Sequence, residues 1–166
     1  NEGNRLATGQ FSSAASIEID TDDPTTETTN RIGLVEHYYD SNGRPWKRRF
    51  HNIDATDGSS DDTLTTLRWY DEAGQLVKED GQHLVKRAYN RLGEITHLYI
   101  LAGDDDSDYD DVLDVAGDVV LQEHQTVGDE SGVLLTSIID RHHDDYGTGE
   151  TLGPLDSDAD DDPLKY

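Results

Sequence analysis

The sequence predicts an all-β fold made of antiparallel hairpins. Short runs in which apolar and polar residues alternate recur along the 166 residues, as in half-buried strands. Turn-forming pairs of Asp or Asn with a following Gly separate many of these runs. We find no amphipathic helical pattern of useful length. The hydrophobic fraction of 33% indicates that any core is thin.

The first segment, residues 1–28, is predicted to hold one strand and a polar linker. Ala15, Ile17 and Ile19 alternate with polar residues, which indicates a strand over 14–20 with one apolar face. The Thr-rich stretch that follows contains Pro24 and is typical of an exposed linker. We expect the strand to join the edge of a sheet, either its own or that of a neighbouring copy.

The stretch 68–81 is the pattern around which the remaining chain is organised. A strand runs into Tyr70, a tight turn passes from Asp71 to Gly74, and a second strand follows. The Asp71 side chain can accept a hydrogen bond from its own backbone two residues on, and glycine tolerates the positive φ that closes such turns. Leu76 and Tyr70 flank the turn as cross-strand neighbours. We therefore expect a positive φ at Gly74, and likewise at Gly93.

The same turn recurs at 39–43 and 89–95, and in weaker form at 29–35, 113–119 and 128–134. The signature residues of these six copies are Asn30, Gly33, Tyr39, Asp40, Gly43, Tyr70, Asp71, Gly74, Tyr89, Asn90, Gly93, Asp114, Gly117, Asp129 and Gly132. Six copies in register indicate an internal repeat.

The pattern Tyr-Asp-x-x-Gly-x-aliphatic resembles the signature of the RHS/YD-repeat family over residues 29–155. The resemblance to these bacterial extracellular proteins implies a long, continuous wound sheet of hairpins, with a structural, encapsulating or adhesive role. Three of the six turns here lack the tyrosine. The resemblance implies a YD-repeat β-domain at 29–155, followed by an acidic tail at 156–166.

The order of predicted strands follows from the same turns. Expected strands cover approximately 34–39, 44–52, 64–70, 75–79, 83–89, 94–101, 118–126 and 133–142. Acidic loops at 54–63 and 103–111 interrupt them.

The net charge of −24 is carried mainly by the C-terminal part. Residues 31–91 hold ten Lys or Arg and ten Asp or Glu, whereas residues 104–166 hold two and twenty. Nucleic acid and anionic membranes would repel such a chain, and no apolar run is long enough to insert into a bilayer. The sequence favours a divalent cation or a basic surface as partner.

Two acidic stretches place Asp at alternate positions, a spacing that can supply several oxygen ligands to a hard cation. They contain Asp104, Asp106, Asp108 and Asp110 in the first, and Asp156, Asp158 and Asp160 in the second. Ca²⁺ is the cofactor that they suggest. The alternative is that they are solvated loops that keep a sheet protein soluble and protect its edges.

Nothing in the sequence indicates catalysis. Cysteine is absent, and no nucleophile elbow or phosphate-binding glycine loop occurs. The basic and aromatic stretch Trp46–Phe50 is expected to have a structural role, with Lys47 and Arg49 on one strand face, where they can meet carboxylates of a neighbouring repeat or subunit.

We therefore expect a non-enzymatic, extracellular or cell-surface structural protein that associates with itself head to tail, as a fibre subunit or as part of a larger β-shell. The alternative is a Ca²⁺-dependent adhesive module that binds a glycan or a cell-surface protein.

Overall fold

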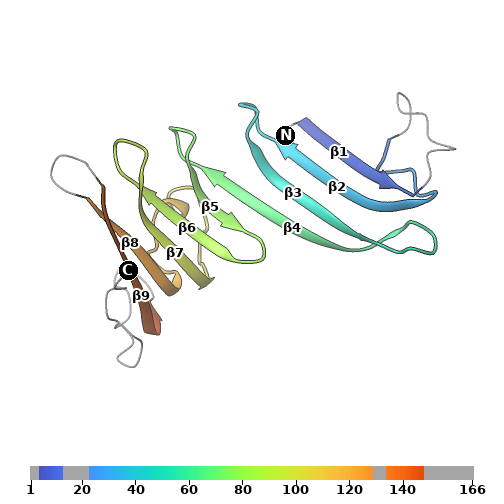
Figure 1. Cartoon of the computed structure of the whole chain (residues 1–166). Helices are drawn as coiled ribbons and strands as arrows, with labels where there is room; N and C mark the ends of the chain where they lie inside the picture. The colour runs from blue at the N-terminus through green and yellow to red at the C-terminus, as the bar shows by residue number, and fades with distance from the viewer. Residues whose placement is uncertain (1–3, 13–22, 129–133, 148–166) are drawn as a thin grey trace. The chain divides into compact units, whose positions relative to one another are not determined.

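The structure, a computed structural model, describes residues 4–12, 23–128 and 134–147, the last of these segments by its backbone. In these described segments, nine β-strands and one turn of 3₁₀ helix follow one another (Figure 1). The elements are β1 (Asn4–Phe11), β2 (Arg31–Tyr39), β3 (Pro45–Ile53), β4 (Ser60–Tyr70), β5 (Leu76–Asp80), β6 (Leu84–Tyr89), β7 (Ile95–Gly103), η1 (Asp111–Leu113), β8 (Val119–Gly128) and β9 (Leu134–Gly147). The predicted all-β class is confirmed.

The chain forms two compact units, residues 1–68 and 69–166, with the boundary inside β4. In the first unit the strand order is β1-β2-β3-β4, and in the second it is β5-β6-β7-β8-β9. The recorded strand pairs are all antiparallel. Each unit is therefore an antiparallel meander, in which a strand pairs with its neighbours in the sequence.

The eight strands expected from residue 34 onward are confirmed, with ends that differ from the prediction by a few residues. The additional strand β1, which pairs with β2 from Asn4↔Tyr39 to Phe11↔Arg31, was not predicted. Its sequence has only Leu6 and Phe11 as large apolar residues, so the alternation on which the prediction relied is weak there. The strand predicted at 14–20, with Ala15, Ile17 and Ile19, lies outside the described residues.

The core of each unit is thin, as the composition predicted. In the first unit Leu34 and Tyr38 are buried on one face of β2. Among the described side chains of the second unit, the buried apolar ones are Val77, Leu101, Val112 and Val120.

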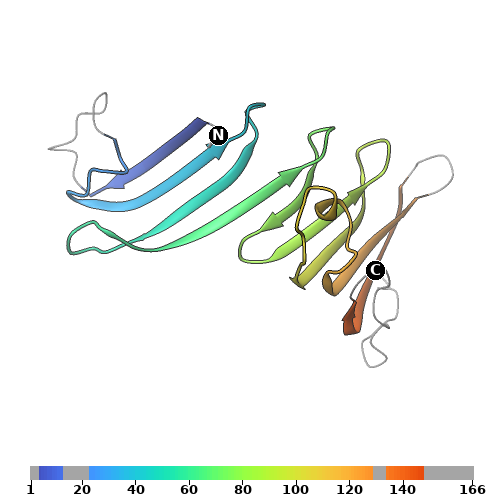
Figure 2. The same ribbon diagram turned by 180° about the vertical axis from the view of Figure 1, so that it is seen from behind.

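Residues 104–118, here called the acidic loop, connect β7 to β8 and carry η1. The loop lies over one face of the second unit, with η1 against β5 and β6 (Figure 2). Val112 of η1 is 4% exposed, so the loop contributes to the core while presenting its many carboxylates around it.

Candidate functional site

The three turns with the full Tyr-Asp or Tyr-Asn signature share the same backbone hydrogen bonds. Each spans five residues, at 40–44, 71–75 and 90–94. The N–H of the first residue donates to the carbonyl of the fifth at 2.9–3.0 Å. The glycine N–H in turn donates to the carbonyl of the first residue at 3.0 Å. The three segments are thus structural copies of one another.

The first side chain in each turn explains why Asp and Asn are interchangeable. Its Oδ1 accepts the N–H of the fifth residue at 2.8 Å in Asp40, 2.7 Å in Asp71 and 3.1 Å in Asn90. This role needs an acceptor oxygen and no charge. The predicted positive φ is confirmed at Gly74 (85°) and Gly93 (82°), and Gly43 has 77°.

The signature tyrosines lie at the last strand position before the turn. Tyr39 pairs with Pro45, and Tyr89 with Ile95, each next to a shift in strand register. The hydroxyl of Tyr89 donates to the carbonyl of Leu76 at 2.8 Å. This bond connects the end of β6 to the start of β5.

Two of the weaker copies are not hairpin turns. Gly33 lies inside β2, where it pairs with Gln10, and the positive φ of that region is at Asn30 (59°). The predicted turn is wrong there because β2 begins at Arg31 and pairs with β1.

In the other weaker copy, Gly117 does have a positive φ (84°), and Asp114 accepts the N–H of Ala116 at 2.9 Å. These residues belong to the acidic loop, which is too long for the predicted turn.

The sixth copy, with Asp129 and Gly132, lies outside the described residues.

The most unusual feature of the second unit is a pair of lysines that lie directly opposite each other, Lys78 on β5 and Lys86 on β6. Like charges in that position repel. Asp106 of the acidic loop bridges them, with Oδ2 2.7 Å from the Lys78 ammonium and Oδ1 2.7 Å from that of Lys86. Asp104 adds a contact of 2.6 Å to Lys78. The loop is thereby fixed to the hairpin that it covers.

The Lys86 ammonium is surrounded by oxygen atoms of the acidic loop. Besides Asp106, it lies 2.6 Å from Asp118 Oδ2, and it donates to the carbonyls of Asp111 at 3.0 Å and Asp114 at 2.8 Å. Two carboxylates and two backbone carbonyls thus surround one ammonium. Because an ammonium has three donors, these four oxygens use its full capacity.

Burial shifts the ionisation of this cluster. The side chains of Lys78, Lys86, Asp106 and Asp118 are between 0% and 5% exposed. Burial alone would lower the pKa of Lys78, but its hydrogen bonds to Asp104 and Asp106 outweigh burial and raise that pKa. Burial raises the pKa of Asp118, although Lys86 acts in the opposite direction.

The alternate aspartates predicted as metal ligands do not converge on one point. Asp104 and Asp106 contact the lysines, while Asp108 Oδ1 accepts the backbone N–H groups of Asp110 and Asp111 at 2.9 and 3.3 Å. The described carboxylates that do approach one another are those of Asp105, Asp106 and Asp118. Asp156, Asp158 and Asp160 lie outside the described residues.

The sequence interpretation missed Lys78, Lys86 and Asp118. A signal was present, because each lysine lies in one of two predicted strands that only a short turn separates. A short hairpin turn fixes the register of its strands, and that register places the lysines opposite each other. Two paired ammonium groups require carboxylates nearby, and the predicted acidic loop supplies them.

The first unit has its own buried carboxylate, Glu36 on β2, which is 5% exposed. Its Oε2 lies 2.9 Å from His51 Nε2, and its Oε1 accepts the Tyr38 hydroxyl at 3.1 Å. Arg5 approaches Oε1 at 3.4 Å. Burial alone would raise the pKa of Glu36, but the hydrogen bonds from His51 and Tyr38 and the charges of His51 and Arg5 lower it.

The basic side chains of β3 meet a carboxylate and an aromatic ring of the neighbouring strand. Arg49 Nη1 is 4.0 Å from Glu36 on the neighbouring strand, and the ammonium of Lys47 lies 5.0 Å from the Tyr38 ring centre. Lys47 and Arg49 therefore interact with β2 of the same unit.

A small open hollow lies beside the lysine cluster, between the acidic loop and β6 and β7. Its volume is about 160 Å³, and Arg87, Tyr99, Leu113 and Val115 are among its lining residues. Pockets for drug-sized ligands have about 300–1,000 Å³. The hollow therefore does not have the size of a typical small-molecule site.

Comparisons with known proteins add no relative: no protein-family model matches the chain, and no significantly similar sequence was found among curated proteins. In the part of the chain that the structure describes, no helix has the length and apolarity needed to cross a membrane.

Proposed function

We propose that this chain is a structural segment of an extracellular YD-repeat protein, in which strand pairs joined by identical turns add to one another to build a long wound sheet. The observation that carries the proposal is the set of three five-residue turns with the same hydrogen bonds. They occupy every second connection from β2 to β7. A repeat whose geometry is fixed at each turn is suited to extending a sheet and needs no active site.

Self-association is part of the proposal. Among the described strands, β1 and β9 each have one partner and so leave an edge available for another strand. One face of the first sheet also exposes apolar side chains: Leu6 is 57%, Phe50 50% and Leu64 46% exposed. The recorded register places these three residues on the same face. Exposed apolar side chains gathered in this way mark interaction surfaces.

The predicted strand at 14–20 is the proposed joint between copies. Its apolar face of Ala15, Ile17 and Ile19 would be buried on the edge of a sheet, where main-chain hydrogen bonds supply affinity. A head-to-tail contact that does not close produces a fibre.

The test compares the full chain with the Ile17→Asp variant over a range of concentrations, by light scattering and electron microscopy. Ile17→Asp places a charge on the apolar face, whereas the control Ser16→Asp adds the same charge on the opposite face. We expect oligomers that grow with concentration for the full chain and the control, and shorter ones for Ile17→Asp.

Two results would contradict the proposal in different ways. If the full chain stays monomeric at high concentration, self-assembly is wrong. If Ile17→Asp and a chain without residues 1–22 assemble like the full chain, the N-terminal segment is not the joint. Circular dichroism of each variant checks that its strands are retained.

A further inference from the structure

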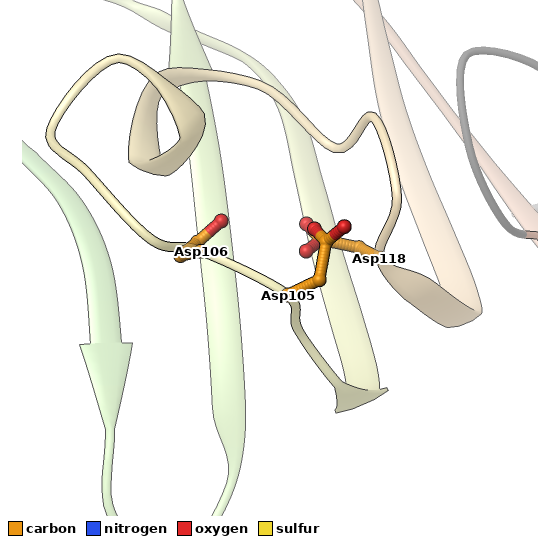
Figure 3. A group of neighbouring side chains, drawn as sticks. All are labelled: Asp105, Asp106 and Asp118. Carbon is orange, nitrogen blue, oxygen red and sulfur yellow. The ribbon is translucent and has the colours of Figure 1, made fainter.

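Three carboxylates of the acidic loop converge beside the lysine cluster. Asp105, Asp106 and Asp118 each place one oxygen within 4.8 Å of the others (Figure 3). The carboxylate of Asp105 occupies the space that a Cβ at Gly117 would need, directly next to Asp118. The loop thus brings Asp118 next to two residues that precede it by twelve and thirteen positions in the sequence.

Asp118 provides an independent sign that a partner is missing from this group. The residue is fully buried, and neither its Oδ1 nor its Oδ2 accepts a hydrogen bond from the described residues. Oδ2 forms an ion pair with Lys86, but that ammonium uses its three donors on Asp106, Asp111 and Asp114, so it has none left for Asp118. An unsatisfied oxygen on a buried charged group is costly.

The charges of the cluster do not balance. Lys78 and Lys86 supply two positive charges, while Asp104, Asp105, Asp106 and Asp118 supply four negative ones. Water could donate a hydrogen bond to Asp118, but it would leave the excess of two negative charges uncompensated. A divalent cation corrects both the charge and the missing contact.

We propose that Asp105, Asp106 and Asp118 bind one divalent cation, with a preference for Ca²⁺ over Mg²⁺. The chemistry of the ligands favours Ca²⁺, because three carboxylates converge here. Ca²⁺ accepts six to eight oxygen ligands in flexible geometry, whereas Mg²⁺ loses its water reluctantly and is usually bound through one or two carboxylates. Water completes the coordination on the solvent side, where Asp105 is exposed.

This site differs from the alternate-aspartate pattern in the sequence. Only Asp106 is common to both sets, since Asp108 bonds the backbone of its own loop. The site is also independent of the proposed assembly, because it lies within the second unit and uses no edge strand.

The test is calorimetric titration of the full chain with Ca²⁺ and with Mg²⁺ in about 0.15 M NaCl, where loosely held counterions are screened. Trp69 gives a second readout, because the Lys78 ammonium lies 4.7 Å from its ring centre. The main variant is Asp105→Asn, because Asp105 is exposed and contacts no lysine in the recorded ion pairs. Asp118→Asn is the supporting variant, with its fold checked by circular dichroism.

Two controls remove the same type of charge elsewhere. The first control is Asp110→Asn. Asp110 lies in the same loop, and its side chain makes no capping hydrogen bond to η1. The triple variant Asp156→Asn, Asp158→Asn and Asp160→Asn removes the alternate aspartates of the other acidic stretch.

We expect one Ca²⁺ per chain, bound more tightly than Mg²⁺. Loss of outer residues around a metal already weakens binding by about tenfold or more, so loss of the Asp105 ligand should cost at least about tenfold. The controls should change the affinity by less than about twofold, as exposed charges do. The proposal is overturned if Ca²⁺ shows no saturable binding, if Mg²⁺ binds equally well, if Asp105→Asn binds normally, or if either control loses binding to the same extent.

Discussion

Single glycines and Asx residues fix the repeated turn of this protein. Gly43 and Gly103 allow the contribution of backbone conformation to be isolated, because a Cβ added at either position meets no atom within 4 Å. They differ in φ, which is positive at Gly43 (77°) and not at Gly103.

We expect Gly43→Ala to reduce the free energy of unfolding by about 1 kcal/mol, because alanine has a Cβ that penalises positive φ. Gly103→Ala is the matched control and should be neutral or slightly stabilising, since glycine is unfavourable in a strand. Urea denaturation followed by tryptophan fluorescence measures both. Equal effects of the two substitutions would show that the turn does not depend on φ at Gly43.

Glu36 makes the stability of the first unit depend on pH. Because its pKa is lowered in the folded protein, its stabilising contribution is present above the ordinary value of 4.5 and is lost as the pH falls through the lowered pKa. We expect Glu36→Gln to cost about 1–3 kcal/mol at pH 7, since it weakens charged hydrogen bonds. This difference from the wild type should shrink as the pH falls below 4.5 and through the lowered pKa.

The measurement uses Trp46 as the reporter of the first unit, in a Trp69→Phe background that removes the other tryptophan. Glu72→Gln, in an exposed turn position, is the control. A difference between Glu36→Gln and wild type that stays constant between pH 7 and pH 3 would contradict the assigned role of this carboxylate.

At the scale of elements, the hairpin of β5 and β6 and the acidic loop depend on each other through Lys86. The loop supplies the four oxygens around the ammonium, and the ammonium holds two segments of the loop together. The Lys86 side chain therefore fixes the path of the loop.

We expect Lys86→Met to reduce the stability of the second unit by about 3–5 kcal/mol, the usual cost of removing one partner from a buried ion pair. Lys86→Met with Asp118→Asn should recover part of the loss, because the second change removes a carboxylate left without its partner. Denaturation followed through Trp69 measures the effect. Arg91→Met, at an exposed position, is the control; an effect of the same size there would contradict this assignment.

Sequence patterns predicted the strands well and the tertiary contacts poorly. Alternation and turn residues are local, so they located the strands from 34 onward and the turns at Gly43, Gly74 and Gly93. The site at Asp118 depends on the path of the acidic loop across β5 and β6, which no local pattern specifies. Gly33 was misassigned because its partner is Gln10, at the far side of a long linker.

At the scale of the whole molecule, charge is distributed unevenly between the two units. Residues 1–68 hold seven Lys or Arg and twelve Asp or Glu, a net charge of −5, while residues 69–166 hold six and twenty-five, a net charge of −19. Self-repulsion opposes a compact state and is screened by salt.

We expect NaCl between about 0.01 and 1 M to raise the melting temperature, since the Debye length falls from about 30 to 3 Å over that range. The rise should be larger for the second unit, which has the greater net charge. Trp46→Phe leaves Trp69 to report on the second unit, and Trp69→Phe leaves Trp46 to report on the first. Melting temperatures that do not respond to salt would contradict this interpretation.

The alternation of fixed and variable connections has a consequence for how such a chain can change. The turns at 40–44, 71–75 and 90–94 have one length, while the intervening connections at 54–59, 81–83 and 104–118 have three different lengths. The first kind of connection therefore keeps one spacing between the strands that it joins, while the second kind accommodates loops of different length. An engineer who grafts a foreign peptide into the 81–83 connection, where Gln82 and His83 are exposed, should leave the pairing of β5 with β6 unchanged.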